Sequence, residues 1–435
     1  MKKSKILVAL LLAFVMVFGV VALVACDKGG DDDAIELVLW APGGAHTFYK
    51  KWADKWAKDY KDSQGRTYTV SLGTMEEGNA PDKLITAPTN GADVFLFADD
   101  QVEDLYINEV LADLGTGAIA QDVTARNSES SVLSATFDGK LLAYPMQADN
   151  TFFLYYNPSM LSDTDVETWD GLFAKLAQIN QGKEINEHVT ASFSFGTPWY
   201  QAAWFFTFGG KIDKTSETFS NPEVGLKALQ AAYEFSKYND LEFLDDNPTP
   251  TTRLANGTLA AAVSGTWIYQ GTIKEMVDRG ELKMTVLPKV KLSNGEEYVP
   301  MKSFISCKLV GVNAYGQYVE ASHSLANYIT NYDVQLAKAL ELGAGPSNIE
   351  AAAKPEVAQL PTVKVVAEQA KFAEPQAPVP STIWKALETC VNSVNSSTTG
   401  GNYFNPDGTP KTSGNYLLTD LLTNLHSAIF PQSIG

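Results

Sequence analysis

The pair Asp99-Asp100 and the following Gln101 are side chains of this chain that are well placed to bind a polar molecule. They come directly after a buried strand that we expect at 92–97. In open α/β sheets, ligands bind beyond the carboxyl ends of the strands, which is where these carboxylates and this amide fall. An acidic N-cap of the next helix, favoured by the helix dipole, is an equally good interpretation and is compatible with the first.

A second group of polar side chains lies between two strand-like runs, and its members are Gln147, Asp149 and Asn150. The first run ends at Pro145, which has no N–H for a sheet ladder, and the second, 152–156, is rich in aromatic residues that suit a pleated surface. We interpret the stretch 137–158 as a crossing between two lobes, with its polar residues facing the space between them. On these residues alone, a β-hairpin on one surface fits equally well.

Two tryptophans stand where an element begins or ends and are therefore free to face a cleft. Trp199 follows Pro198 at the start of an aromatic helical segment, and Trp267 comes just after a buried strand at 259–263. Aromatic faces beside Asp, Gln and Asn are the combination that a carbohydrate needs, because its C–H faces stack and its hydroxyls form hydrogen bonds. Trp52 and Trp56, by contrast, recur at every fourth position of an amphipathic helix and belong to the core.

Strand and helix patterns alternate along the chain, which predicts an α/β protein with parallel strands and βαβ crossovers. A long apolar strand at 303–312 is suited to cross back between lobes, and the Pro- and Ala-rich stretch 370–380 is a linker or a third crossing. Strands are also expected at 35–40, 67–72 and 284–287, and helices at 48–60, 80–86, 105–114, 169–179, 222–238, 251–255, 317–330, 334–342, 383–394 and at the end of the chain up to 430.

The bulk properties exclude some ligands. The length of 435 residues fits two large lobes. A net charge of −18 argues against nucleic acid, whose binding needs clustered Lys and Arg. Arginine is scarce, and since Arg is the preferred partner of carboxylate and phosphate, a strongly anionic ligand is disfavoured.

The N-terminus has the layout of an export signal. A basic start is followed by an unbroken apolar run from 6 to 25, which is also long enough for a retained helical anchor. Leu23-Val24-Ala25-Cys26 resembles a lipobox, so we expect a lipoprotein signal peptide at 1–25, lipidation of Cys26 and a flexible acidic tether at 26–34. Of the remaining cysteines, Cys307 and Cys390, we expect both to be buried free thiols.

Several segments occur together and in the order that is typical of one family: LVLW, GADVFLFADD, DGKLLAYPMQADNTFFLYYNPSML, TPWYQAAWFFTFGG, LANGTLAAAVSGTWIY, MTVLPKV and PSTIW. With these motifs the chain resembles the family-1 extracellular solute-binding proteins of ABC importers, the group that includes maltose-binding protein. The resemblance covers nearly the whole mature chain. It implies a two-lobed periplasmic-binding-protein-like α/β fold with three crossing segments, and a monomer that closes on its ligand and presents it to permease subunits.

The resemblance also implies site residues and lobe boundaries. Asp100 looks like the acidic residue that hydrogen-bonds a sugar hydroxyl. The aromatic residues that stack on sugar rings correspond to Trp199, Trp267 and Trp384, and Trp40 falls where the family also lines the cleft. The first lobe is expected at 35–145 plus 306–374, and the second lobe is expected at 148–302 plus 378–435.

Departures from the family pattern put maltose itself in doubt. Gln101 stands where the maltose-binding member has a basic residue, Pro42-Gly43-Gly44 replaces polar residues, and Thr197 replaces a Glu. The first crossing is one residue longer, so the position of the family's acidic residue falls on either Asp149 or Asn150.

The alternatives to sugar binding are a secreted glycosidase, a ferric-ion site and a polyamine site. A secreted glycosidase needs two carboxylates flanking the bond about 5–10 Å apart, and the adjacent Asp99 and Asp100 cannot flank it, although Asp149 is a conceivable distant partner. G-x-S-x-G, H-E-x-x-H and Walker motifs are absent from the sequence, and the four histidines show no ligand spacing, so we expect no catalytic residue, metal or cofactor. Tyr155-Tyr156 resembles a ferric-ion pair but fits a structural role better. A polyamine held in a cage of carboxylates and tryptophans is the main rival ligand.

Overall fold

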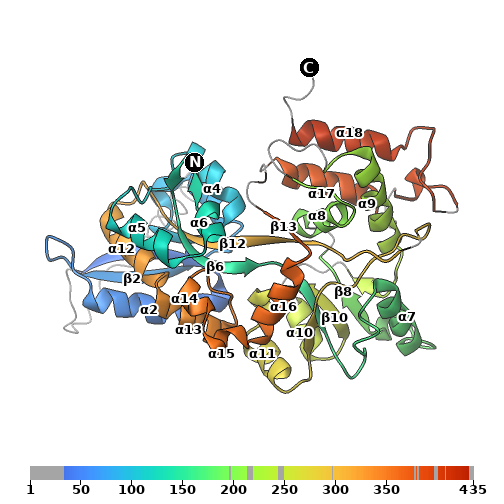
Figure 1. Ribbon diagram of the computed structural model, residues 1–435, viewed down its shortest axis with the longest axis horizontal. Helices are drawn as coiled ribbons and strands as arrows, with labels where there is room; N and C mark the ends of the chain where they lie inside the picture. The colour runs from blue at the N-terminus through green and yellow to red at the C-terminus, as the bar shows by residue number, and fades with distance from the viewer. Residues whose placement is uncertain are drawn as a thin grey trace, which may run out of the picture.

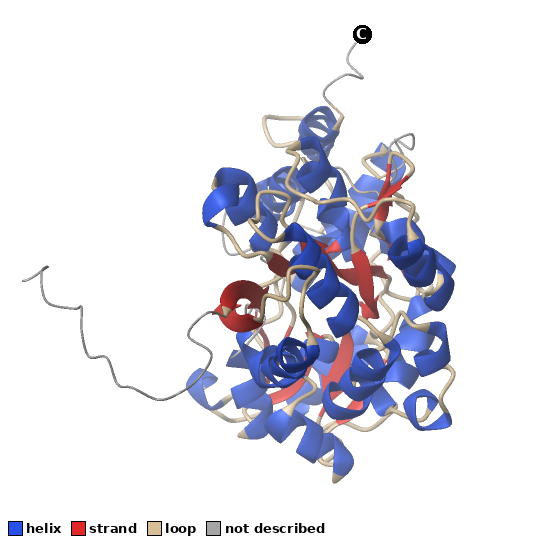
Figure 2. Ribbon diagram, turned by 90° about the vertical axis from the view of Figure 1, so that its left-hand side faces the viewer, coloured by secondary structure: helices blue, strands red, loops and turns tan. Residues whose placement is uncertain are grey.

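The computed structural model describes residues 34–430, except 195–196, 213–218, 243–248, 296, 377–378, 380–381, 396–399 and 407. The predicted signal peptide, Cys26 and all of the tether except its last residue lie outside the described residues. The molecule has two lobes, each built on its own sheet, with helices packed around the strands (Figures 1 and 2). The predicted two-lobed α/β fold is therefore confirmed.

The sheet of the first lobe has the order β13-β12-β3-β1-β2, with β6 also paired to β12. β1 runs parallel to β2 and β3, as predicted, whereas β12 runs antiparallel to β3 and β6. The strands are β1 (Ile35–Ala41), β2 (Tyr68–Thr74), β3 (Val94–Ala98), β6 (Tyr144–Asn150), β12 (Ser303–Val312) and β13 (Ala373–Pro375). A separate hairpin joins β4 (Thr136–Phe137) to β5 (Lys140–Leu141).

The sheet of the second lobe has the order β11-β7-β10-β8-β9. Its central strand β10 is antiparallel to β7 and parallel to β8. The strands are β7 (Phe153–Tyr156), β8 (Thr190–Ser192), β9 (Leu241–Glu242), β10 (Leu259–Ser264) and β11 (Lys283–Thr285).

Helices cover both sheets, and their apolar stripes explain where they pack. The predicted stripe of α2 is buried at Phe48, Trp52 and Trp56. The helices of the first lobe are α2 (His46–Asp59), α3 (Ala80–Thr86), α4 (Val102–Ile107), α5 (Ala118–Arg126), α6 (Glu129–Ser134), α12 (Val319–Ile329), α13 (Tyr332–Leu342), α14 (Ile349–Ala352) and α15 (Pro355–Ala358). The remaining helices are α7 (Trp169–Ile179), α8 (Pro198–Thr207), α9 (Pro222–Phe235), α10 (Thr249–Ala255), α11 (Gly271–Asp278), α16 (Pro361–Ala370), α17 (Ile383–Ser393) and α18 (Leu418–Ile429).

The stretch 137–158 is a crossing and not a surface hairpin. β6 pairs with β12 in the first lobe, whereas β7, two residues further on, pairs with β10 and β11 in the second. β12 makes another crossing, since Phe304 near its start packs in the core of the second lobe and Val312 at its end packs in the core of the first. β6 and β12 run across the middle of the molecule (Figure 1). β13 pairs with the first residues of β12.

Three details differ from the sequence-based expectations. β6 continues through Pro145 to Asn150, because register shifts in the ladder with β12 accommodate the missing N–H of the proline. The helix expected at 105–114 ends at Ile107, and Glu109 then adopts a left-handed conformation with φ of 57°. Some helices were not expected: α5 and α6, which precede the first crossing, and α11, α14, α15 and α16.

The position of α16 corrects one predicted lobe boundary. Val365 and Val366 of this helix are buried in a cluster with Phe153 and Tyr155 of β7, so the helix covers the second sheet. The residues 361–370 therefore belong with the second lobe, although the sequence placed them in the first. The physical reason is that the apolar face of α16 is buried against the second sheet, a pairing that the sequence of the helix does not specify. The other lobe boundaries stay predictions.

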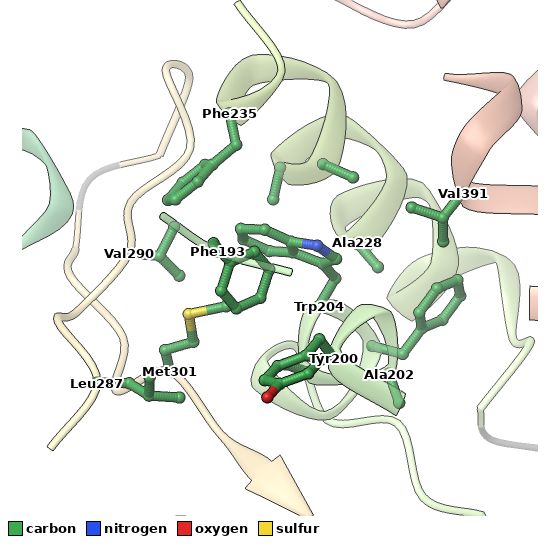
Figure 3. Close-up of a cluster of buried hydrophobic side chains, with 14 of the residues drawn as sticks. Phe193, Tyr200, Ala202, Trp204, Ala228, Phe235, Leu287, Val290, Met301 and Val391 are labelled. Atoms are coloured by element: carbon green, nitrogen blue, oxygen red, sulfur yellow. The ribbon is translucent and has the colours of Figure 1, made fainter. Parts of the chain in front are cut away.

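The core of the second lobe is rich in aromatic residues, and Figure 3 shows its central part. Trp204 is fully buried between Phe193 and Phe235, with ring centroids 5.7 and 4.5 Å away. The indole of Trp169 donates from Nε1 to the sulfur of Met301 at 3.3 Å. This packing gives a rigid support for the end of the molecule that carries α8.

Cys307 and Cys390 are buried free thiols, as predicted. Burial raises the thiol pKa of each to about 12, so neither is reactive at neutral pH. Among the described residues, no helix combines the length and the apolar character needed to span a lipid bilayer.

Candidate ligand-binding site

A cavity of about 460 Å³ lies between the two lobes. Both lobes and the crossing segments contribute to its lining, and its size falls within the range of small-molecule sites. The first lobe and the crossings provide Pro42, Gly44, Ala45, Glu76, Glu77, Gly78, Ala98, Asp100, Gln101, Gln147, Asn150, Lys308, Lys338, Leu342, Ala344 and Gln376. The second lobe provides Thr197, Pro198, Trp199, Thr266, Trp267, Tyr269, Gln270 and Trp384.

The polar wall is formed by three loops that follow parallel strands. β1 ends at Ala41, β2 at Thr74 and β3 at Ala98, and each strand is followed at once by residues that line the cavity. This is the edge at which open α/β sheets bind ligands, as the sequence predicted for the third strand. The loop after β1 lies close to the opposite lobe, since a Cβ at Gly44 would lie 2.5 Å from Nε2 of Gln270 and would displace the end of that side chain.

Asp100 and Gln101 present hydrogen-bond acceptors with no partner. Within the part of the chain that the structure describes, neither Oδ1 of Asp100 nor Oε1 of Gln101 accepts a hydrogen bond, although both atoms are buried. The other end of the Gln101 amide is fixed, since its Nε2 donates to the carbonyl of Gly78 at 3.2 Å. Buried acceptors are normally paired, so a ligand that carries hydroxyl donors would satisfy both.

The charge of Asp100 depends on its environment. Burial raises the pKa of its carboxyl to about 6, and hydrogen bonds from its backbone, from Gln376 and from Trp384 offset part of this effect. The carboxyl is therefore ionised at neutral pH and acts only as an acceptor. The N-cap interpretation is wrong for both aspartates, because neither side chain caps the helical segment that follows. Asp99 instead accepts from the backbone N–H of Cys307 at 2.9 Å and does not line the cavity.

The aromatic wall consists of three tryptophans of the second lobe, which two phenylalanines support. The ring of Trp199 lies 5.8 Å from that of Trp267, 4.9 Å from Phe152 and 6.4 Å from Phe304, nearly parallel to the last. Trp384 packs edge-on against the same Phe304 at 5.8 Å. Nε1 of Trp199 donates to Oε1 of Gln376 at 2.8 Å, which fixes the orientation of its ring.

The indole of Trp267 lies directly on the backbone of Gly265. A Cβ built on Gly265 would come within 1.9 Å of Cζ3 of the ring, closer than any two nonbonded carbons approach. Gly265 follows β10 in an extended conformation, with φ of −119°, so its backbone does not require glycine. The close approach of the ring therefore accounts for the glycine at this position.

Besides Asp100, the charged residues of the lining are two lysines and two glutamates, Lys308, Lys338, Glu76 and Glu77. Nζ of Lys308 forms an ion pair with Glu77 at 2.6 Å and lies 5.6 Å from the ring centre of Trp267. Burial alone would lower the pKa of Lys308, but the glutamate beside it raises the pKa above its ordinary value. Nζ of Lys338 donates to the hydroxyl of Tyr49 at 2.8 Å and to Oε1 of Gln147.

Six of the predicted site residues line this cavity and two do not. Those that line it are Asp100, Gln101, Asn150, Trp199, Trp267 and Trp384. Trp40 projects from a face of the sheet and lies against Gly73 of β2, so it cannot reach beyond the strand end. Asp149 is 1% exposed and accepts from Nε2 of Gln147 and from the N–H of Gly345. For these two residues the geometry does not support the predicted ligand contact.

Sequence reasoning did not find Lys308, Lys338, Gln376, Tyr269 and Gln270 as cavity residues. Lys308 alternates with apolar residues in a strand that reads as core, and Lys338 sits in an ordinary amphipathic helix. The sequence signal available for these two lysines was a charged residue on an otherwise apolar face, because lysine is seldom buried without a partner.

The tyrosine pair has a structural role. Tyr155 donates to the carbonyl of Gly265 at 2.9 Å, and Tyr156 donates to Asp163 at 2.8 Å. Their side chains pack in different clusters on opposite faces of β7 and cannot converge on one metal ion. In the described part of the chain, no three His, Cys, Asp or Glu side chains are grouped so that they could hold a metal.

The chain forms two lobes joined by crossing segments, and an aromatic and a polar wall enclose a cavity between them. This arrangement is that of the two-lobed solute-binding proteins. The model of the family described as bacterial extracellular solute-binding protein matches residues 55–365, and the chain belongs to this family. Members of this family bind solutes and are not enzymes. The expected family resemblance is thereby confirmed.

Individual relatives are distant. The galactooligosaccharide-binding protein of Bacillus subtilis (strain 168) is 24% identical over 327 residues, which cover 70% of this chain and 72% of the relative. Among solved structures, a maltodextrin binding protein from L. casei BL23 without ligand has a TM-score of 0.69 at 22% identity, covering 91% of this chain and 99% of that one. The Thermus thermophilus maltotriose binding protein bound with maltotriose has a TM-score of 0.72 at 19% identity, covering 92% and 100%. These structural matches establish the fold.

Proposed function

We propose that this protein binds an oligosaccharide outside the cytoplasm and delivers it to an ABC importer by closure of its two lobes. The two partnerless acceptors in the cavity, Oδ1 of Asp100 and Oε1 of Gln101, support this proposal most directly. Both residues line the cavity, whose opposite wall carries Trp199, Trp267 and Trp384. Hydroxyl donors on one side of a sugar and C–H faces on the other match these two walls.

Closure follows from the way in which the cavity is divided. A ligand that touches both walls has more contacts in the closed form than in the open form, and its differential affinity therefore favours closure. The galactooligosaccharide-binding relative and the solved maltodextrin- and maltotriose-binding proteins agree with a carbohydrate as the ligand class. None of them specifies which sugar this chain takes.

The rival polyamine ligand is disfavoured by charge. Lys308 and Lys338 both line the cavity, and a second cation placed beside them would be repelled. The described lining carries three acidic residues, Glu76, Glu77 and Asp100, against these two lysines, which leaves one negative charge. One negative charge is too few to balance a polycation.

The proposal includes an anchor and partners. Lipidation of Cys26 would hold the protein at the outer face of the cell membrane, and the acidic tether would let the lobes reach the permease subunits. We propose that the protein acts as a monomer, because the binding cavity is completed by the two lobes of one chain.

The experiment is a titration of the mature protein, produced without its lipidated first residue so that it starts at residue 27. The ligands are galacto-oligosaccharides, malto-oligosaccharides, oligosaccharides that contain uronic acid, and spermidine, and binding is followed by tryptophan fluorescence. Three tryptophans in the lining make this signal sensitive to a ligand. The expected result is a saturable change with at least one oligosaccharide and none with spermidine. A response to spermidine or to a peptide but to no sugar would refute the proposed function.

A further inference from the structure

Lys338 is a buried cation that has no carboxylate partner. Its side chain comes from α13 and lines the cavity, but the residue is only 6% exposed. Its two hydrogen bonds go to neutral oxygens, the hydroxyl of Tyr49 and Oε1 of Gln147. No ion pair with Lys338 occurs between residues 34 and 430 where the structure describes them. An ammonium group has three N–H donors, so one of them is left for a molecule in the cavity.

The hydrogen bonds of Gln147 explain why this charge remains uncompensated. Nε2 of Gln147 donates to Oδ1 of Asp149 at 2.7 Å, which fixes the amide with Oε1 toward Lys338. Asp149 also accepts from the N–H of Gly345 at 2.5 Å and is fully enclosed. The carboxylate of Asp149 is thus held one side chain away from Lys338, behind the amide of Gln147, and is fixed there by its own hydrogen bonds.

The other lysine of the cavity serves as a contrast. Lys308 is neutralised by Glu77 at 2.6 Å, whereas Lys338 has the same degree of burial without such a partner. Burial lowers the pKa of Lys338 to about 8; Glu77 and Asp149 raise the pKa from a distance, and Lys308 lowers it further. The group is still mainly charged at pH 7, and a buried charge without a partner is costly.

We infer that the bound oligosaccharide carries a carboxylate, as a uronic acid residue does, and that Lys338 binds it. This inference rests on the proposed function and names its ligand class. A neutral hydroxyl would need no charge at this position, since an amide donor is sufficient for it. A carboxylate matches the single positive charge, whereas phosphate is recognised preferentially by arginine, and none of the described lining residues is arginine.

This conclusion departs from the sequence-based argument that scarce arginine disfavours an anionic ligand. That argument counted arginines over the whole chain, and the fold instead brings two lysines to one cavity. Only one of these lysines is free to pair with a ligand. A single carboxylate is therefore favoured over a polyanion.

The test compares galacturonate oligomers with galactose oligomers of equal length and linkage at pH 7, using the full mature protein and tryptophan fluorescence. The uronate is expected to bind at least about tenfold more tightly, a ratio equivalent to about 1.4 kcal/mol. Equal or tighter binding of the neutral oligomer would overturn the inference and leave the proposed function intact. If neither of them bound but a malto-oligosaccharide did, the inference would fail and the proposed function would stand; if no oligosaccharide bound, both would fail.

A pH series from 7 to 9.5 gives a second readout on the unaltered protein. Asp100, with its pKa of about 6, stays ionised over this range, whereas Lys338 loses its proton. The preference for the uronate is expected to decline through about pH 8. A preference that stayed constant up to pH 9.5 would contradict the role of Lys338.

The variant Lys338→Met removes the charge and keeps most of the apolar stem. It is expected to lose the preference for the uronate, whereas the control Lys364→Met, on the exposed face of α16, is expected to retain it. A folded Lys338→Met protein that still prefers the uronate would overturn the inference. If this variant does not show a cooperative melting transition, the pH series on the wild-type protein tests the role of Lys338 in its place.

Discussion

The contact between Gly265 and Trp267 can be tested by adding one methyl group. In Gly265→Ala the new Cβ would lie 1.9 Å from Cζ3, 2.3 Å from Cη2 and 2.4 Å from Cε3 of the indole. Carbon atoms pack at about 3.5 Å or more, so the ring has to move by about 1.5 Å. Gly265 supports one face of the ring, which leaves movement toward the cavity and Lys308.

The expected cost falls on binding and not on folding. Displacing a central aromatic contact costs about 1.5–2 kcal/mol in a binding site, which corresponds to an affinity lowered about 10- to 30-fold. Alanine is allowed at a φ of −119°, and the loss of glycine reduces the entropy of the unfolded chain by about 0.4–1 kcal/mol in favour of folding. The melting temperature should therefore change little.

The assay is a titration with whichever oligosaccharide binds the wild-type protein, together with thermal unfolding. Gly117→Ala is the matched control, because a Cβ there meets nothing within 4 Å and the residue lies outside the cavity. In a Trp267→Ala background, Gly265→Ala should have no further effect on affinity, since the ring that it displaces is gone.

Wild-type affinity in folded Gly265→Ala would refute the reasoning, because it would mean that the position of the Trp267 ring does not matter for the ligand. Additive losses in the double variant would show that Gly265 acts through some other contact.

Three further predictions concern neighbouring groups. Trp267→Ala should weaken binding by at least tenfold and leave the far-ultraviolet circular dichroism unchanged; full affinity would remove this residue from the site. Asp100→Asn should weaken sugar binding and raise the melting temperature at pH 7. The folded protein raises the pKa of this carboxyl to about 6, so the ionisation of Asp100 lowers the stability of the wild-type protein as pH rises from 4 to 6, and asparagine avoids this loss. A lower melting temperature of the variant would contradict this sign. Gln369→Ala leaves the N–H of Leu287 without its acceptor at 2.9 Å and should reduce the free energy of unfolding by about 1–3 kcal/mol; no change in chemical denaturation would refute it.

Much of the fold could be predicted from short patterns. The stripe of Phe48, Trp52 and Trp56 specifies a helix because its spacing depends only on helical geometry. The assignment of α16 was not predictable in this way, because its apolar face fits either sheet and only the tertiary arrangement selects the second. The crossing at 137–158 was ambiguous for the same reason, since strand pairing is not encoded within the strand itself.

The site was predictable where a residue follows a strand end. Asp100, Gln101 and Trp267 are in this position, and all three line the cavity. Trp40 is the last residue but one of its strand, and the alternation of side chains turns it onto the face of the sheet. Lys338 lies on the amphipathic helix α13, and no local pattern reveals that its charge enters the cavity.

The central claim is that the cavity between the lobes binds an oligosaccharide against its aromatic wall. Isothermal titration calorimetry of the mature protein with neutral and uronic-acid oligosaccharides, repeated with Trp267→Ala, tests it most directly. The account predicts saturable binding of one ligand per chain for at least one of these sugars, and a loss of at least tenfold in the variant. The absence of heat with every oligosaccharide, together with saturable binding of spermidine or a peptide, would contradict it.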